Sequence, residues 1–446
     1  MIASIDWLEM SAILERKRLF RVIEYCYAAS ALFVLTQGPV QRLWAASSLR
    51  LDLLPEPSIA HAQFATFTFA QLPGVLLWFR RVDHGWLIAR SNQMLVLFLS
   101  WLGLGIAWST FSRQSLPEFV ALIVTSMFGL YLSETFTNRR FWWIVAAATS
   151  SGLCASWFSI VRLWDGAVNF QGDYWVGIYG NRNSLSPVAA VAVLSVLGIV
   201  CDRISGRRRR SAQGAFGAIL LLSITAFSGL MLWRSRSQTS PVALVIVIVA
   251  SFLWLLVRWV SGRLRALSKL RAFSARVTLV LLAFGVFWTL KSIGASTSLS
   301  SDTTTFNSRR ALWAVNWSGF LEKPWHGWGW MAARFTPDFF QQGVWWAATE
   351  TRWSHNGYHD LLLGGGVLAG VLFFFYVWES ARSFDIVPAS VGLPRFAACV
   401  FVLAAATQES FFVGSNFLWA LLVAVLADAR RASSSAEEDD ARHQPT

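Results

Sequence analysis

Arginines at the ends of apolar segments are the first residues in this sequence whose positions suggest chemistry. Arg234 and Arg236 interrupt the run "SGLMLWRSRSQTSPVALV" without a neighbouring acid, and Arg309 and Arg310 begin "SRRALWAVNWSGFLEKPW". An ionised side chain near hydrocarbon costs about 2.5–3.5 kcal/mol at a helix centre, so such positions need a reason. Because a guanidinium binds phosphate oxygens in pairs and keeps its charge, these arginines predict a phosphate or diphosphate ligand.

A third group of polar residues occurs in "FQGDYWVGIYGNRNSLSPVAAV". We expect a helix to begin there, with Ser184 or Ser186 as its cap. Asn181, Arg182 and Asn183 then lie at the start of the helix, where backbone N–H groups already favour an anion. Asn183 is therefore a candidate substrate-binding residue.

Two of the six histidines, His355 and His359, are four residues apart in "SHNGYHDLLLGGGVLAG". Such a pair on one helix face can bind a metal, although Asp360 points elsewhere and no third ligand is evident. Either histidine can also be an interfacial side chain without chemistry. A third interpretation is that a neutral imidazole takes a proton from a substrate hydroxyl in a site of low polarity.

Metal sites have little support elsewhere in the sequence. No Asp-x-Asp pair or carboxylate cluster stands out among the segments expected on the outer face. The four cysteines are scattered one to a segment, which predicts neither a disulfide framework nor a zinc site. If a diphosphate leaves at this site, arginines rather than a metal must stabilise its charge.

The elements that position these residues are predicted to be transmembrane helices. The chain has 446 residues, of which 55% are hydrophobic and only 14% charged, a balance typical of polytopic membrane proteins. Apolar windows long enough to cross a bilayer recur about twelve times. The fold class that we predict is an all-α polytopic bundle with about 12 spans. The windows are 22–37, 61–79, 92–110, 117–133, 141–161, 185–201, 214–232, 240–258, 275–292, 357–378, 395–411 and 414–428.

The distribution of basic residues orients the bundle. Most of the 38 lysines and arginines fall in alternate connections, which the positive-inside rule assigns to the cytoplasm together with both termini. The net charge of +13 is thus a topology signal and does not predict a nucleic-acid partner. This orientation puts the groups around Arg236, Arg309 and His355 on the outer face. It also divides the chain into a cytoplasmic segment at 1–21, nine spans within 22–290, a long periplasmic loop at 291–356, three spans within 357–428 and a disordered cytoplasmic tail at 429–446.

The long outer loop carries a helical pattern of its own. Trp313, Trp317, Phe320 and Leu321 recur at helical spacing, which predicts a helix over 308–322 at the membrane surface. Ser308 is its expected N-cap, and Pro324 is expected to stop it. Arg309 and Trp313, four residues apart, share a face of this helix. Further on, glycines 364–366 and Gly370 allow close helix packing or a lipid groove below the site.

Four of these stretches resemble, in order and spacing, the motifs of the O-antigen ligase family. They are "YGNRNSLSPVAAV", "SRSQTSPVAL", "SRRALWAVNWSGFLEKPWHGWGW" and "SHNGYHDLLLGGGVLAG". The family contains C-type membrane glycosyltransferases that use polyprenyl-pyrophosphate glycans, invert the anomeric centre and need neither metal nor cofactor. The resemblance covers roughly residues 175–375.

Carried over residue by residue, the resemblance implies that Arg236 and Arg309 hold the lipid-linked pyrophosphate. It implies that His355 acts on the acceptor, and that these three residues form the catalytic set. Arg234, Arg310, Asn183 and Asn356 are then expected to bind substrate. Arg234 and Arg310 each stand beside a matched arginine, so either member of a pair is a candidate.

The expected donor is therefore an undecaprenyl-pyrophosphate-linked glycan and the expected acceptor a glycolipid, lipid A-core in a ligase. A polymerase or a protein O-oligosaccharyltransferase of the same superfamily would use another acceptor. The resemblance also implies a bacterial inner membrane, with the active site on the periplasmic face and membrane lipids around the bundle. A transporter of an anionic lipid or solute is the alternative of another class, with Glu134 or Glu409 for proton coupling.

Overall fold

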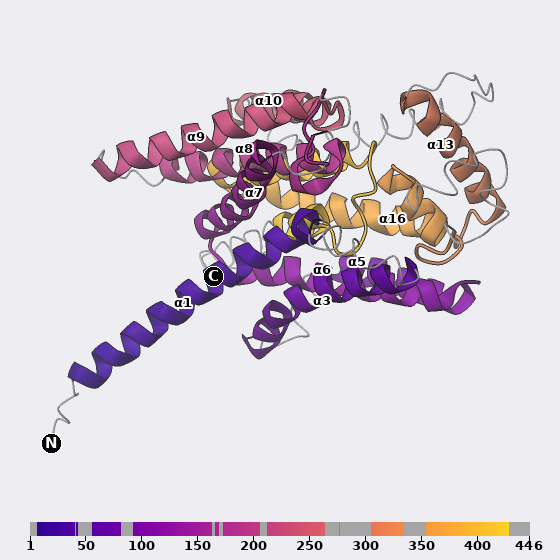
Figure 1. Cartoon of the computed structure of the whole chain (residues 1–446), viewed down its shortest axis with the longest axis horizontal. Coiled ribbons are helices and arrows are strands. Elements are labelled where there is room, and N and C mark those ends of the chain that lie inside the picture. The colour runs from indigo at the N-terminus through magenta and orange to yellow at the C-terminus, as the bar shows by residue number, and fades with distance from the viewer. Residues whose placement is uncertain are drawn as a thin grey trace, which may run out of the picture.

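The structure of the chain is a computed structural model (Figure 1). The structure describes residues 7–40, 42, 56–81, 92–162, 166–168, 173–205, 212–263, 276, 305–333 and 354–427. This part of the chain is all-helical, and its β pairing is limited to an isolated bridge between Val168 and Trp175. The predicted span at 275–292 lies outside the described residues, apart from Arg276.

The described helices follow one another in chain order. The first five are α1 (Trp7–Leu35), α3 (Glu56–Arg81), α5 (Gln93–Leu104), α6 (Ser112–Thr135) and α7 (Asn138–Val161). After the single turn η2 (Gly177–Tyr179) come α8 (Arg182–Ser205), α9 (Ala212–Ser235), α10 (Thr239–Arg263), α13 (Thr305–Glu322), α16 (Gly357–Ile386) and α17 (Ala389–Ala405). A last helix covers Phe417–Ala427.

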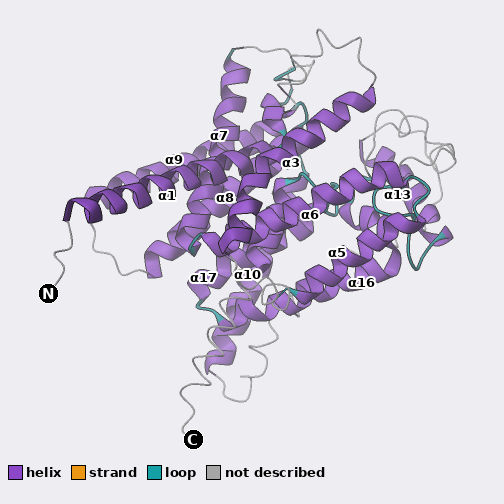
Figure 2. Ribbon diagram, turned by 90° about the horizontal axis from the view of Figure 1, so that it is seen from below, coloured by secondary structure: helices purple, strands orange, loops and turns teal. Residues whose placement is uncertain are grey.

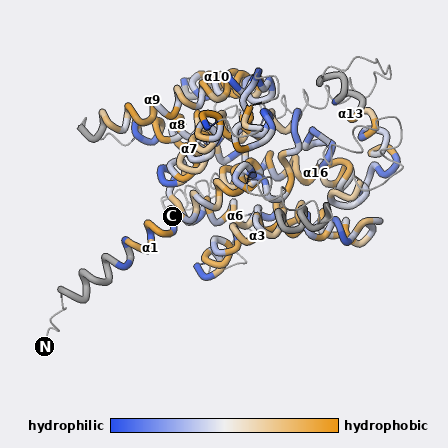
Figure 3. The backbone as a smooth tube through the Cα atoms, in the orientation of Figure 1, coloured by the Kyte–Doolittle hydropathy of each residue, from blue (hydrophilic) through white to orange (hydrophobic). Residues whose placement is uncertain are grey.

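Six of the described helices are long and apolar enough to cross a membrane. They are Ser112–Thr135, Asn138–Val161, Arg182–Ser205, Ala215–Ser235, Thr239–Ser261 and Gly357–Ile386. Three further apolar helices are shorter, at Gln93–Trp108, Ala389–Ala405 and Phe417–Ala427. Hydrophobic residues dominate the long helices, and hydrophilic ones gather at helix ends (Figure 3). The chain is thus a multi-pass membrane protein, and the total of about twelve spans stays a prediction.

Helix α8 lies at the centre of one half of the bundle and packs on α7, α9, α10 and α17. Small side chains allow these close approaches, as at Gly198, where an added Cβ would lie 2.4 Å from the Trp142 ring. In the other half, α5 and α16 run beside each other (Figure 2). Both halves meet in one continuous core of buried apolar residues.

Helix α16 is broken at Gly366, where φ is +67° and ψ is −166°. The break folds the first part of the helix back. Tyr358 and Phe373 would lie roughly 22 Å apart on a straight helix, yet both rings contact Phe412, at centroid distances of 5.1 and 4.8 Å. A side chain at Gly366 would meet the Trp325 carbonyl carbon at 2.3 Å. Only glycine adopts this backbone without strain, so Gly366 brings the start of α16 next to the segment after α17.

Helix α13 packs on α16 through the face that carries Leu312, Trp313 and Phe320, all of which are buried. It ends at Glu322, just before Pro324, as the sequence predicts. The prediction of Ser308 as N-cap is wrong, because the helix begins three residues earlier at Thr305. In Figure 1, α13 lies at one end of the molecule, beyond the ends of α9 and α10.

Candidate active site

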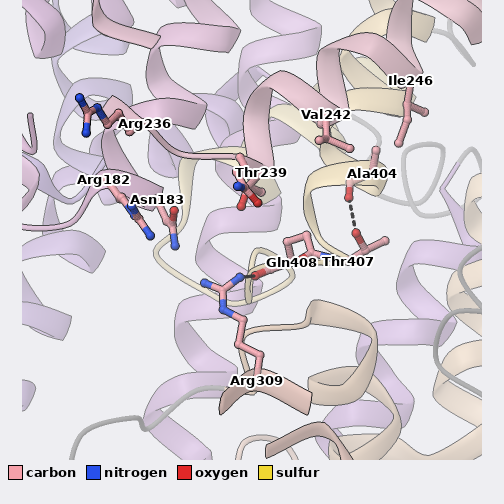
Figure 4. Close-up of a pocket in the computed structure, with 12 residues that line it drawn as sticks. Arg182, Asn183, Arg236, Thr239, Val242, Ile246, Arg309, Ala404, Thr407 and Gln408 are labelled. Atoms are coloured by element: carbon pink, nitrogen blue, oxygen red, sulfur yellow. Dashed lines mark hydrogen bonds between the residues drawn. The ribbon is translucent and has the colours of Figure 1, made fainter. Parts of the chain in front are cut away.

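A pocket of about 460 Å³ opens where α8, α10, α13 and the end of α17 meet (Figure 4). The first residues of α8 and α10, Arg182 and Thr239, both line it, so two helix N-termini are directed to the same space. Its remaining walls are partly polar and partly apolar. They comprise Asn183, Arg236, Gln238, Val242, Ala243, Ile246, Arg309, Ala404, Thr407 and Gln408.

Three arginines from three different elements therefore line one pocket, as an anion site requires. Arg182 comes from α8, Arg236 from the α9–α10 turn and Arg309 from α13. Within the described residues, neither Arg182 nor Arg236 forms an ion pair. Together with the partial positive charge of two helix N-termini, this leaves a strong excess of positive charge. The pocket is suited to an anion with several oxygens.

Glu409 links Arg309 to His355. Its Oε1 accepts a hydrogen bond from Arg309 Nη2 at 2.6 Å, and its Oε2 lies 2.8 Å from His355 Nδ1. Arg309 Nη1 also donates to the Gln408 carbonyl at 2.9 Å. A carboxylate at this distance keeps the imidazole proton on Nδ1 and leaves Nε2 as a proton acceptor. The three side chains thus form an arginine–carboxylate–imidazole chain that reaches from the pocket wall to the His355 ring.

The start of α16 holds His355 in place. Asn356 is the N-cap, and its Oδ1 accepts from the backbone N–H groups of Tyr358 at 3.0 Å and His359 at 3.2 Å. Its Nδ2 donates to the Thr407 carbonyl at 3.0 Å, which fastens the segment that carries Glu409. His355 itself has φ +47°, a left-handed conformation that is uncommon for residues other than glycine. Asn356 therefore positions both His355 and Glu409, rather than facing the pocket.

Backbone bonds also fix the turn that carries Arg236. Arg236 has φ +50° and its N–H donates to the Trp233 carbonyl at 3.2 Å. Ser237 Oγ donates to Asn183 Oδ1 at 2.9 Å, which ties the turn to the start of α8. The predicted substrate-binding residue Asn183 thus lines the pocket and supports the Arg236 turn at the same time. In Figure 4 the Arg236 side chain runs away from Arg309.

Residues that are close together in the sequence have different surroundings in the structure. Arg234 does not line the pocket; its guanidinium stacks on the Trp175 ring at 4.6 Å. The side chain of Arg310 lies outside the described residues. His355 and His359 do not share a helix face, because His355 precedes the N-cap, whereas His359 is buried with its ring 6.2 Å from that of Trp313.

The α7–α8 connection was expected to end in a serine cap, and this expectation is wrong. Asn181 caps α8, since its Oδ1 accepts from Asn183 N–H at 2.8 Å, and the helix begins at Arg182. The side chain of Asn reaches the second amide of the helix as readily as that of serine does. Ser184 and Ser186 lie within the helix.

Glu409 is the residue of this site that the sequence interpretation assigned to another role, proton coupling in a transporter. Its partners are 54 and 100 residues away in the chain, so no local spacing connects them. The available signal was an acid inside the apolar stretch "AAATQESFFVG", where an unpaired carboxylate is costly. Within the described residues, no group of three or more His, Cys, Asp or Glu side chains is placed to hold a metal ion.

Comparison with known protein families gives a match for part of the chain. Residues 221–374 match the family described as O-antigen ligase. The chain carries an O-antigen ligase domain. No curated protein matches the chain. With its membrane-crossing helices, the O-antigen ligase domain indicates a membrane glycosyltransferase of the O-antigen ligase or polymerase type. The matched segment contains Arg236, Arg309 and His355, whereas Arg182 and Glu409 lie outside it.

Proposed function

We propose that this protein transfers a glycan from a polyprenyl-pyrophosphate carrier to a hydroxyl group of a surface glycolipid, on the periplasmic face of the bacterial inner membrane. The observation that carries the proposal is the continuous chain from the arginine-lined pocket through Glu409 to His355. A cation for the leaving diphosphate and a base for the attacking hydroxyl are thereby held by one carboxylate. Lipid A-core is the acceptor that the family resemblance favours.

The two kinds of wall in the pocket fit the two ends of such a donor. Arg236, Arg309 and the N-termini of α8 and α10 provide donors for diphosphate oxygens. Val242 and Ile246, one helical turn apart on α10, form an apolar wall together with Ala404 of α17. An isoprenoid chain can follow this wall between α10 and α17, which pack against each other. A small hydrophilic anion would leave the wall unused.

The proposed reaction is a direct displacement at the anomeric carbon. His355 Nε2 takes the proton of the acceptor hydroxyl as its oxygen forms the new glycosidic bond, and Glu409 stabilises the resulting imidazolium. The bond between the anomeric carbon and the diphosphate oxygen breaks on the opposite side, which inverts the configuration. Arg236 and Arg309 neutralise the charge that develops on the leaving diphosphate. No metal ion or cofactor enters this scheme.

The test uses the full chain in lipid vesicles with an undecaprenyl-pyrophosphate-linked glycan and EDTA. We expect lipid A-core to gain glycan, and we expect His355→Ala to lower the rate about 10²- to 10⁴-fold, the usual contribution of a general base. Arg236→Ala and Arg309→Ala should weaken donor binding as well as lower the rate. The matched control is His326→Ala, because His326 contacts the edge of Trp108 and lies outside the pocket.

The acceptor added to the vesicles distinguishes the related activities. Glycan gained by a second lipid-linked repeat would indicate a polymerase, and glycan gained by a serine or threonine peptide a protein glycosylation enzyme. If no acceptor gains glycan while the vesicles move the lipid-linked glycan across the bilayer, the transferase proposal is wrong and the chain is a transporter. Dependence on a divalent metal would contradict the role given to the arginines.

A further inference from the structure

Arg182 is the third arginine of the pocket, and no role of its own in binding substrate was predicted for it from the sequence. It is the first residue of α8 and lines the pocket together with Arg236 and Arg309. Figure 4 shows the Arg182 side chain directed toward the middle of the pocket and toward Arg309, whereas that of Arg236 runs the other way. We propose that Arg182 is a diphosphate-binding residue, which faces Arg309 across the pocket and contacts the donor from the opposite side. This inference rests on the proposed function.

The Arg182 guanidinium is held in this place without its charge being neutralised. It lies over the Tyr174 ring, 4.9 Å from the ring centroid. Stacking on an aromatic ring restricts a guanidinium but leaves its N–H groups free for an anion. Within the described residues, Arg182 has no carboxylate partner, in contrast to Arg309 with Glu409. A half-buried cation with unused donors at a helix N-terminus is arranged for a multivalent anion.

The connection that presents Arg182 is itself anchored to the bundle. Tyr179 is buried, and its hydroxyl donates to Thr36 Oγ1 at 3.1 Å. Burial raises the pKa of Tyr179, so the phenol stays protonated and keeps this bond. Trp175 N–H donates to the Arg234 carbonyl at 3.0 Å, which ties the same connection to the α9–α10 turn. Arg182 and Arg236 are thus carried by two segments that are bonded to each other.

This arrangement gives Arg309 and Arg182 different roles. Arg309 shares Glu409 with His355, so it lies next to the reacting end of the donor. Arg182 faces it from α8 and holds the diphosphate between two cations. The Arg182 guanidinium forms no covalent bond and moves no proton; it compensates the charge that the diphosphate carries before and after the glycosidic bond breaks.

The experiment measures binding and turnover for Arg182→Gln in full-length protein in vesicles. Undecaprenyl pyrophosphate without a glycan serves as competitor, and undecaprenol as its uncharged counterpart. Loss of charge-assisted hydrogen bonds should raise the donor KM and the inhibition constant of the pyrophosphate about tenfold to a hundredfold. Inhibition by undecaprenol should not change. Arg182→Lys should recover part of the loss, because lysine keeps the positive charge but lacks the planar pair of N–H donors of arginine.

Arg162→Gln is the matched control, since Arg162 stacks on Phe158 at 5.3 Å and lies outside the pocket. Its donor KM should stay within twofold of wild type. If Arg182→Gln keeps wild-type KM and pyrophosphate inhibition, Arg182 does not contact the diphosphate. Should Arg182→Gln fail to fold, Arg182→Lys and Tyr174→Leu provide the same comparison. A wild-type protein that binds undecaprenyl pyrophosphate but transfers no glycan would overturn the proposed function, while the binding comparison would still decide the role of Arg182.

Discussion

Replacing Glu409 by glutamine tests the link between the cation and the base. Arg309 Nη2 donates to one carboxylate oxygen at 2.6 Å, and His355 Nδ1 donates to the other at 2.8 Å. A glutamine side chain has a single oxygen, and Arg309, which has only donors, needs it. The amide NH₂ group then faces His355 Nδ1, which must become an acceptor. The imidazole proton moves to Nε2, the nitrogen that the reaction needs unprotonated.

We therefore expect Glu409→Gln to lower kcat about 10²- to 10⁴-fold, because the substitution imposes the wrong tautomer and removes the charge that stabilises the imidazolium. The donor KM should change much less, since the amide keeps the bond to Arg309. Initial rates of glycan transfer in vesicles at saturating acceptor give both constants. Glu409→Asp keeps the charge and should retain more activity than Glu409→Gln.

The matched control is Glu322→Gln, which removes an exposed carboxylate from the same helix that carries Arg309. Its rate should equal that of wild type within about twofold. If Glu409→Gln folds and turns over at a rate within threefold of wild type, His355 is not a base oriented by Glu409. A large rise in donor KM with unchanged kcat would instead assign Glu409 to Arg309 alone.

The structure leads to three further predictions. Gly366→Ala should lower the yield of folded protein and its melting temperature, because φ is +67° and the new methyl group would lie 2.3 Å from the Trp325 backbone. In the same melting experiment Gly229→Ala should be tolerated, because the space around Gly229 is open. Arg234→Gln should keep transfer activity within a few-fold of wild type while Arg236→Gln loses it, since only Arg236 lines the pocket. Asn356→Ala should lower the free energy of unfolding by about 1 kcal/mol, because the N-cap of α16 is lost, and it should also lower kcat. A loss of stability without a loss of rate would contradict the role of Asn356 in positioning His355.

Local patterns in the sequence predicted most of the described helices, and also Arg236 and Arg309, two of the three arginines that line the pocket. The four-residue spacing of Arg309 and Trp313 predicted a shared face. In the structure Trp313 Nε1 donates to the Ser354 carbonyl at 3.0 Å, and Arg309 is joined to His355 through Glu409. The start of the span predicted at 357–378 is also confirmed, because α16 begins at Gly357. These features depend on neighbours within one or two helical turns, which periodicity reports directly.

Features that depend on distant contacts could not be predicted. Glu409 joins the site only because α16 folds back at Gly366, and glycine in an apolar run indicates close packing as readily as a break. The choice between Arg234 and Arg236 depends on which side chain stacks on Trp175, from another connection. Tertiary contacts between distant segments decide which residues enter the site, and no regular spacing in the sequence reports such contacts.

Arg236 and His355 both have left-handed backbones, with φ of +50° and +47°. For residues with a Cβ this conformation costs roughly 1–2 kcal/mol, and glycine avoids the cost. The chain would therefore hold these two turns more easily with glycine at both positions, but the guanidinium and the imidazole would be absent. A library selected for heat resistance alone should accumulate glycine or asparagine at 236 and 355, whereas selection for growth that requires the enzyme should retain arginine and histidine.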